Sequence, residues 1–365
     1  MQATETKIGD ILESQAAEIT RLACEDLFAT APDLAQHFGD DYADLWQQHF
    51  RQRVTELSSA IRTGEPRLFC ERISWSRQAM LARTELEDGV SQTTDIYLSN
   101  SLDSLRNALI AVLDDKLAPA AISIISEAKA SLANPVQISN QPLLDPRDPL
   151  QRISLQYLQA ALEGNTPQAM QIVLEAVGVS ITPKQALQQV LLDAQREIGR
   201  LWHLAEVSVA EEHLVTSTTQ RTMALIAETA ENAPANGKTA LCASVAGNVH
   251  DLGIRTIAYL LEAEGWRAVY LGQDMPNSEI VDAIGYYDAD VVLLSLALPT
   301  QISSLSECIG AVRQRYAGMP VIIGGNAFTE NPGIWKVTGA DGYSPDAEQA
   351  IALAEALTTP LEDEF

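Results

Sequence analysis

The first third of the chain carries apolar residues at helical spacing and few residues that interrupt a helix. Within residues 5–133, aliphatic side chains recur every three or four positions, as in residues 8–12, 45–57 and 96–113. This spacing places them on one face of a helix. Gly and Pro stand mainly at breaks such as residues 64–66. The pattern predicts an all-helical domain over residues 1–134.

A proline-rich stretch then separates this domain from a second helical unit. Residues 135–149 contain four prolines, which lack the N–H that a helix interior needs, so we expect a linker there. Apolar periodicity resumes beyond it, and four helices with short connections predict a small bundle over residues 150–235. The expected helices cover residues 150–162, 167–177, 182–204 and 207–232.

From residue 236 to 365 the pattern changes to alternating strands and helices. The apolar runs are continuous, which is typical of parallel strands that are buried on both faces. A multidomain α and α/β protein is therefore expected, ending in a five-stranded, flavodoxin-like Rossmann domain. The expected strands are 239–246, 267–272, 290–297, 320–325 and a weaker one at 341–344, and the expected helices are 253–264, 277–287, 302–316 and 346–357.

Composition narrows the classes of function. The 365 residues carry a formal net charge of −25, which repels phosphate backbones and disfavours direct binding to nucleic acid. The four cysteines lie far apart, as in reduced proteins of the cytoplasm. No signal peptide is recognisable at the start, and no apolar run approaches the roughly 20 residues that span a bilayer. We expect a cytoplasmic protein with no membrane contact.

The loop at residues 247–253, Gly-Asn-Val-His-Asp-Leu-Gly, carries the clearest chemical signal. It follows the first expected strand and precedes a helix, which is the usual ligand position in a doubly wound sheet. His250 in this loop offers an imidazole, a good ligand for transition metals that include cobalt. A histidine in such a loop is more often a solvated residue than a metal ligand. Other motifs in the chain are therefore needed to assign His250 as a ligand.

The C-terminal domain resembles the cobalamin-binding domain of corrinoid proteins such as cobalamin-dependent methionine synthase. That family carries Asp-x-His-x-x-Gly, then Ser-x-Leu, then Gly-Gly. The resemblance implies that His250 is the lower ligand of cobalt, and that the displaced nucleotide tail enters a groove where Ser295 bonds its base. The matching residues are Asn248, His250, Gly253, Ser295, Ala297, Gly324 and Gly325, with Asp251 inside the first motif.

Two positions depart from that family pattern. Asn248 replaces the acidic residue that would fix the tautomer of the imidazole and make it more basic. Its carbonyl can still accept the imidazole N–H, but without the charge. Ala297 replaces leucine. Gly253 is expected to allow tight packing where the helix starts, and Gly324 and Gly325 to let the backbone approach the tail closely.

A second motif lies in the expected bundle. Trp202 is followed, after nine residues, by Glu212 and His213, which resembles the signature of light-sensing, adenosylcobalamin-binding proteins of the CarH type. The resemblance implies a bundle that caps the upper face of the corrin. Trp202 would shield the cobalt–carbon bond, and Glu212 would accept hydrogen bonds from ribose hydroxyls. His203 would bind cobalt after the adenosyl group leaves, although His213 remains an alternative ligand.

The N-terminal domain is where the chain departs from that second family. CarH-type repressors have a DNA-binding winged helix at this place, whereas residues 1–134 show no turn-and-wing pattern and no basic recognition helix. They faintly resemble the helical, globin-like sensor domains of stress-signalling proteins. His37 and His49 are expected at the surface rather than on a haem. Dimerisation and contact with a signalling partner are the expected roles.

Several functions remain open at this stage. The first is a light-responsive adenosylcobalamin receptor, not an enzyme, that acts in signal transduction or transcription regulation through a protein partner or a homo-oligomer. The alternatives are a corrinoid carrier subunit for methyl transfer, which needs a methyltransferase partner, and a cobalamin sensor without light response. Radical catalysis with adenosylcobalamin lacks a recognisable substrate domain.

Overall fold

The computed structural model describes residues 2–84, 90–133, 141–329 and 332–359. It divides into two compact units, Met1–Ser139 and Asn140–Phe365. The part of the linker at residues 134–140 lies outside the described residues. None of the described helices is long and apolar enough to cross a membrane.

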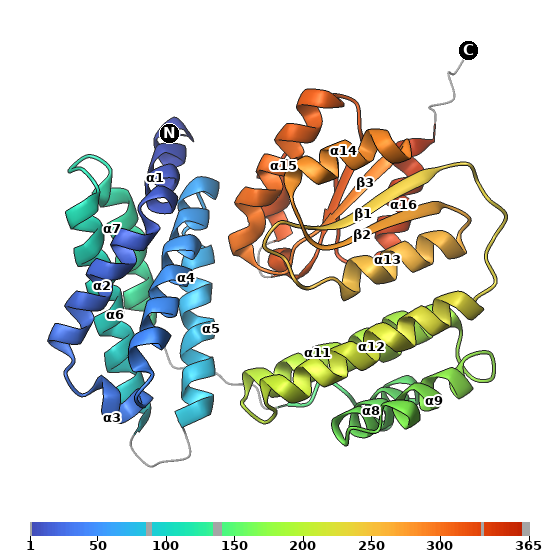
Figure 1. Ribbon diagram of the computed structural model, residues 1–365, viewed down its shortest axis with the longest axis horizontal. Helices are drawn as coiled ribbons and strands as arrows, with labels where there is room; N and C mark the ends of the chain where they lie inside the picture. Colours follow the sequence, from blue (N-terminus) through green and yellow to red (C-terminus); the bar gives the residue numbers. More distant parts are fainter. Residues whose placement is uncertain (1, 85–89, 134–140, 330–331, 360–365) are drawn as a thin grey trace. The chain divides into compact units, whose positions relative to one another are not determined.

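The first unit is helical throughout its described residues, as the periodicity predicts (Figure 1). Trp46 and Phe50 are fully buried in its core. Arg53 and Glu56 form a buried ion pair there. The expectation that His49 lies at the surface is wrong. Its Nε2 atom accepts a hydrogen bond from Arg53 at 3.3 Å, and its ring packs on Trp46. The helices are α1 (Gln2–Ser14), α2 (Ala16–Thr30), α3 (Leu34–Phe38), α4 (Tyr42–Thr63), α5 (Arg67–Thr84), α6 (Val90–Val112) and α7 (Ala118–Ser131).

The second unit begins with the helical bundle. Its helix starts are fixed by side-chain caps: Asp148 accepts two backbone N–H groups, and Thr182 and Ser208 each form a capping box. The expected helix at 182–204 contains a π-helical segment that the sequence pattern does not predict. The elements are α8 (Pro149–Leu162), α9 (Thr166–Ala176), α10 (Pro183–Gln185), the π-helix η1 (Ala186–Leu191), α11 (Leu192–His203) and α12 (Val209–Thr229).

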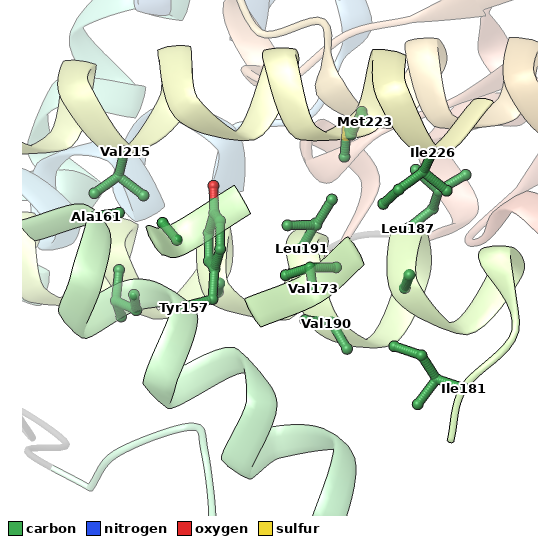
Figure 2. Close-up of a cluster of buried hydrophobic side chains, with 14 of the residues drawn as sticks. Tyr157, Ala161, Val173, Ile181, Leu187, Val190, Leu191, Val215, Met223 and Ile226 are labelled. Carbon is green, nitrogen blue, oxygen red and sulfur yellow. The ribbon is translucent and has the colours of Figure 1, made fainter. Parts of the chain in front are cut away.

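Aliphatic side chains and one tyrosine fill the bundle core (Figure 2). Tyr157 points its hydroxyl towards α12, on which Val215, Met223 and Ile226 lie. The same cluster of buried residues continues into the next domain through Leu260 and Ala347. The bundle therefore packs on the α/β domain through a shared apolar core, which fixes it against one face of that domain.

The α/β domain is a five-stranded parallel sheet in the order β2-β1-β3-β4-β5. This order confirms the flavodoxin-like prediction. Helices α13 and α16 pack together on one face, and α14 and α15 on the other (Figure 1). The elements are β1 (Thr239–Val245), α13 (Leu252–Ala263), β2 (Arg267–Met275), α14 (Asn277–Tyr287), β3 (Val291–Ser295), α15 (Ile302–Arg315), β4 (Val321–Gly324), β5 (Gly342–Ser344) and α16 (Ala347–Thr358), with 3₁₀ turns η2 (Pro299–Gln301), η3 (Asn326–Phe328) and η4 (Pro332–Val337).

Candidate functional site

The loop that follows β1 presents His250 to solvent on a tightly bonded backbone. His250 itself is exposed, whereas Asn248 is completely buried. The Asn248 Oδ1 atom accepts the backbone N–H of His250 at 3.1 Å. Its Nδ2 atom donates to the carbonyls of His250 at 3.2 Å and of Ser295 at 3.0 Å. The structure thus places the Asn248 amide on the backbone of the loop rather than on the imidazole.

Two further side chains hold this loop in place, and the sequence did not point to either. The buried Gln301 donates from Nε2 to the carbonyl of Gly247 at 2.8 Å, and its Oε1 accepts the N–H groups of Ala297 and Leu298. Asp274 accepts the N–H of Gly247 at 2.6 Å. Gln301 therefore ties the loop after β3 to the loop after β1, and Ala297 contributes a backbone N–H rather than a side chain.

Asp251 lies directly after His250 and is buried at the start of α13. Its Oδ2 pairs with Arg255 at 2.6 Å and accepts the hydroxyl of Tyr270. Burial, together with this hydrogen bond, raises the pKa of Tyr270. The Asp251 Oδ1 atom accepts from Gln220 of α12 at 3.4 Å. The Asp251 carboxylate therefore links the bundle to the α/β domain by a hydrogen bond.

A cavity of about 620 Å³ opens beside the carboxyl ends of β3, β4 and β5. Four of the predicted site residues line it together, namely Gly253, Ser295, Gly324 and Gly325. Its apolar wall comes from residues such as Ile257 and Ile323. The bundle supplies a further part of the wall through Gln188, Gln189, Leu192, Asp193 and Arg196.

The three predicted site glycines differ in what they do. A Cβ atom on Gly325, whose φ is 115°, would lie 2.1 Å from the carbonyl oxygen of Leu296. A Cβ on Gly324 would lie 2.8 Å from the carbonyl oxygen of Ser344. Both glycines are thus required by neighbouring backbone. Gly253 differs, because apart from its chain neighbours and its own helix no protein atom lies within 4 Å of its Cβ position, which borders the cavity.

The bundle residues of the second motif gather where α11 ends and α12 begins. Trp202 and His203 are half-buried in the last turn of α11. Glu212 and His213 lie in the first turn and a half of α12, with His213 Nδ1 2.8 Å from Glu212 Oε2. The structure therefore brings the glutamate and the histidine together as a pair, and the tryptophan stands on the preceding helix.

The spacing along α12 relates this pair to the loop of His250. His213 and Gln220 are seven residues apart, so they share a face of α12 and are separated by about 10 Å along its axis. Gln220 bonds Asp251, the neighbour of His250. Large apolar side chains are exposed at both ends of this span, with Val249 at 59% and Val209 at 56% exposed.

These residues fit a corrinoid better than a metal ion held by protein alone. Among the described residues, no group of three or more His, Cys, Asp and Glu side chains is placed to hold a metal ion. A corrin ring would bring nitrogen ligands of its own to the cobalt, so one protein donor such as the imidazole of His250 would be enough. The exposed imidazole of His250 meets that requirement, and Asn248 of the same loop is hydrogen-bonded to Ser295, which lines the cavity.

Changing Asn248 to aspartate should destabilise the protein, although aspartate is the usual residue of the resembling family. An ionised carboxylate cannot donate to the carbonyls of His250 and Ser295, and it would be a buried charge. We expect the free energy of unfolding to fall by about 2 kcal/mol, measured by urea unfolding. Asn232→Asp adds the same charge at an exposed position and should be neutral. Equal stability of both variants would show that the Asn248 bonds are unimportant.

Comparison with known proteins agrees with this geometry. Residues 238–352 match a family model described as a B12 binding domain, and residues 154–227 match a second model with the same description. Dimethylamine corrinoid protein 3 of Methanosarcina acetivorans is 24% identical over 196 residues, which cover 51% of this chain and 89% of that protein. The transcriptional repressor CarH of Myxococcus xanthus is 27% identical over 157 residues, 42% of this chain and 52% of the repressor.

A solved structure also aligns with part of the chain. The monomethylamine corrinoid protein of Methanosarcina barkeri aligns with a TM-score of 0.49 and 18% identity, covering 57% of this chain and 99% of that protein. Several similar curated proteins are named dimethylamine corrinoid proteins, whereas the match to CarH covers 52% of the repressor. The second unit is therefore a B12-binding helical cap followed by a B12-binding Rossmann-like domain, and the chain is a corrinoid-binding protein.

Proposed function

We propose that this chain is a corrinoid carrier that holds cobalamin between the loop of His250 and the bundle, with its nucleotide tail in the 620 Å³ cavity. One observation carries the proposal: Ser295, Gly324 and Gly325 line a cavity whose edge is hydrogen-bonded, through Asn248, to the loop of His250. The curated relatives that are named as dimethylamine corrinoid proteins support the carrier role over other corrinoid functions.

The residues of the chain divide the work of holding the cofactor. Bound cobalamin supplies a cobalt centre that can carry an alkyl group. His250 would donate an imidazole nitrogen to the lower face of the cobalt, and Asn248 would keep the loop in the required shape. Ser295, which lines the cavity, would offer a hydroxyl to the base of the tail. A methyltransferase that approaches the upper face is the partner that such a carrier needs.

A second function, light-responsive adenosylcobalamin signalling, is favoured by the pair of Glu212 and His213. A carboxylate beside an imidazole on the capping helix offers acceptors to the hydroxyls of an adenosyl group, which a methyl group does not need. Trp202 on the preceding helix would add an apolar lid. In this function, loss of the adenosyl group would change the contacts of the bundle and bias its position.

Loading the full chain with methylcobalamin or adenosylcobalamin separates the two functions. If the chain is a carrier, it should bind methylcobalamin, and green light should leave the elution volume of its adenosylcobalamin complex in size-exclusion chromatography unchanged. A tighter adenosyl complex whose spectrum and elution volume both change on illumination would favour the light sensor instead. Uptake of neither cofactor would contradict both functions.

A further inference from the structure

A chain of hydrogen bonds runs from the pair of Glu212 and His213 into the bundle core. The Thr216 hydroxyl lies 2.8 Å from Glu212 Oε1 and 3.0 Å from Gln195 Oε1. Gln195 Nε2 donates to Thr219 Oγ1 at 2.8 Å, and Thr219 in turn lies 2.8 Å from the hydroxyl of Tyr157. Four side chains therefore connect the carboxylate to the centre of the bundle.

The inner end of this chain is rigidly held. Tyr157 and Thr219 are both completely buried, and Tyr157 is packed among the apolar core residues drawn in Figure 2. Burial raises the pKa of Tyr157 to about 12, so its hydroxyl keeps its proton and remains a donor at neutral pH. Because Tyr157 and Thr219 are fixed, the hydrogen bonds of this network hold the side chains of Gln195 and Thr216 in defined orientations.

At the outer end of this chain of hydrogen bonds, Glu212 can still accept hydrogen bonds from a bound ligand. The Thr216 hydroxyl has one hydrogen and lies within reach of two acceptors, Glu212 Oε1 and Gln195 Oε1. The Glu212 side chain is 28% exposed, and its second oxygen is beside His213. A carboxylate offers about four acceptor sites, so Glu212 can accept hydrogen bonds from outside the protein while its orientation stays fixed.

We propose that Thr216 and Gln195 are positioning residues that aim Glu212 at a hydroxyl-bearing upper ligand of the cobalt, and so set which alkyl group the corrinoid carries. The inference rests on the proposed cobalamin site. An upper ligand with vicinal hydroxyls, as in a nucleoside, gains hydrogen bonds from the aimed carboxylate. A methyl group has no donor, so its binding does not depend on where Glu212 points.

Thr216→Val tests this inference because it removes the hydroxyl and keeps the branched shape. We expect the dissociation constant for adenosylcobalamin to rise about tenfold, as for the loss of one hydrogen bond that orients a charged acceptor. The dissociation constant for methylcobalamin should stay unchanged, and Thr216→Ser should restore adenosylcobalamin binding. Titrations followed by absorbance in the dark give both constants.

Thr218→Val provides a matched control in the same helix. Thr218 is buried and its hydroxyl lies 3.2 Å from that of Thr166, away from the chain to Glu212. Both valine variants should lower the melting temperature of the cofactor-free protein by similar amounts, but only Thr216→Val should change ligand preference. Equal weakening of both cobalamins, or no change for adenosylcobalamin, would overturn the inference. Failure of the unmodified chain to bind either cobalamin would overturn the proposed site itself.

Discussion

Replacing His250 with alanine should lower the affinity for cobalamin about a hundredfold or more and abolish the spectrum of histidine-ligated cobalt. Loss of a residue that merely orients a metal ligand already costs about 10- to 100-fold in metal affinity, and loss of the ligand itself should exceed that. The effect on folding should be small, because the imidazole is exposed and Asn248 bonds the backbone of His250 rather than its ring. Absorbance titration and urea unfolding measure the two quantities.

His37→Ala is the control for the His250 variant. His37 lies in the first unit, and its nearest charged partner is Asp33 at 3.7 Å. This variant should bind cobalamin as the unmodified chain does. Free imidazole added to the His250→Ala protein should partly restore the ligated spectrum. An unchanged spectrum in His250→Ala would show that another group, such as His203 or His213, binds the cobalt.

The fold is predictable from the sequence where burial is regular. The apolar runs of β1 and β3 are buried along nearly their whole length, so each reads as a strand without ambiguity. Strand β2 extends to Met275, beyond the expected end at residue 272, because the exposed polar residues Gln273 and Asp274 interrupt its apolar pattern. The π-helix Ala186–Leu191 escapes prediction because one extra residue in a turn barely changes helical periodicity.

The site is only partly predictable, for a related reason. His250, Ser295 and the paired glycines belong to short motifs that stand at strand ends, where topology brings them together. Gln301 and Thr216 act through partners that are 54 and 21 residues away in the sequence. Local patterns do not encode such distant partners. Asn248 shows the limit most clearly, since its family resemblance suggested a contact with the imidazole and the structure gives it backbone carbonyls instead.

Gly325→Ala should cause the largest loss of stability, lowering the free energy of unfolding by about 4 kcal/mol. The new methyl group would meet the Leu296 carbonyl at 2.1 Å, and the φ of 115° is one that side-chain-bearing residues rarely adopt. The neighbouring backbone cannot move freely, because the Leu296 N–H donates to the Gly324 carbonyl at 3.1 Å. Urea unfolding followed by circular dichroism would measure the change.

Gly253→Ala should behave in the opposite way, and the pair separates two reasons for a glycine in a cofactor motif. Apart from its chain neighbours and its own helix, no protein atom lies within 4 Å of the Gly253 Cβ position, and the residue is helical, so alanine should leave stability unchanged or raise it by about 0.5 kcal/mol. Its methyl group would nevertheless enter the cavity and weaken cobalamin binding. A destabilised Gly253→Ala protein would contradict the open space. Unaltered binding would instead show that the nucleotide tail does not pass Gly253. Weaker binding by a fully stable protein would show that Gly253 is needed to make room for the ligand, whereas Gly325 is needed for folding.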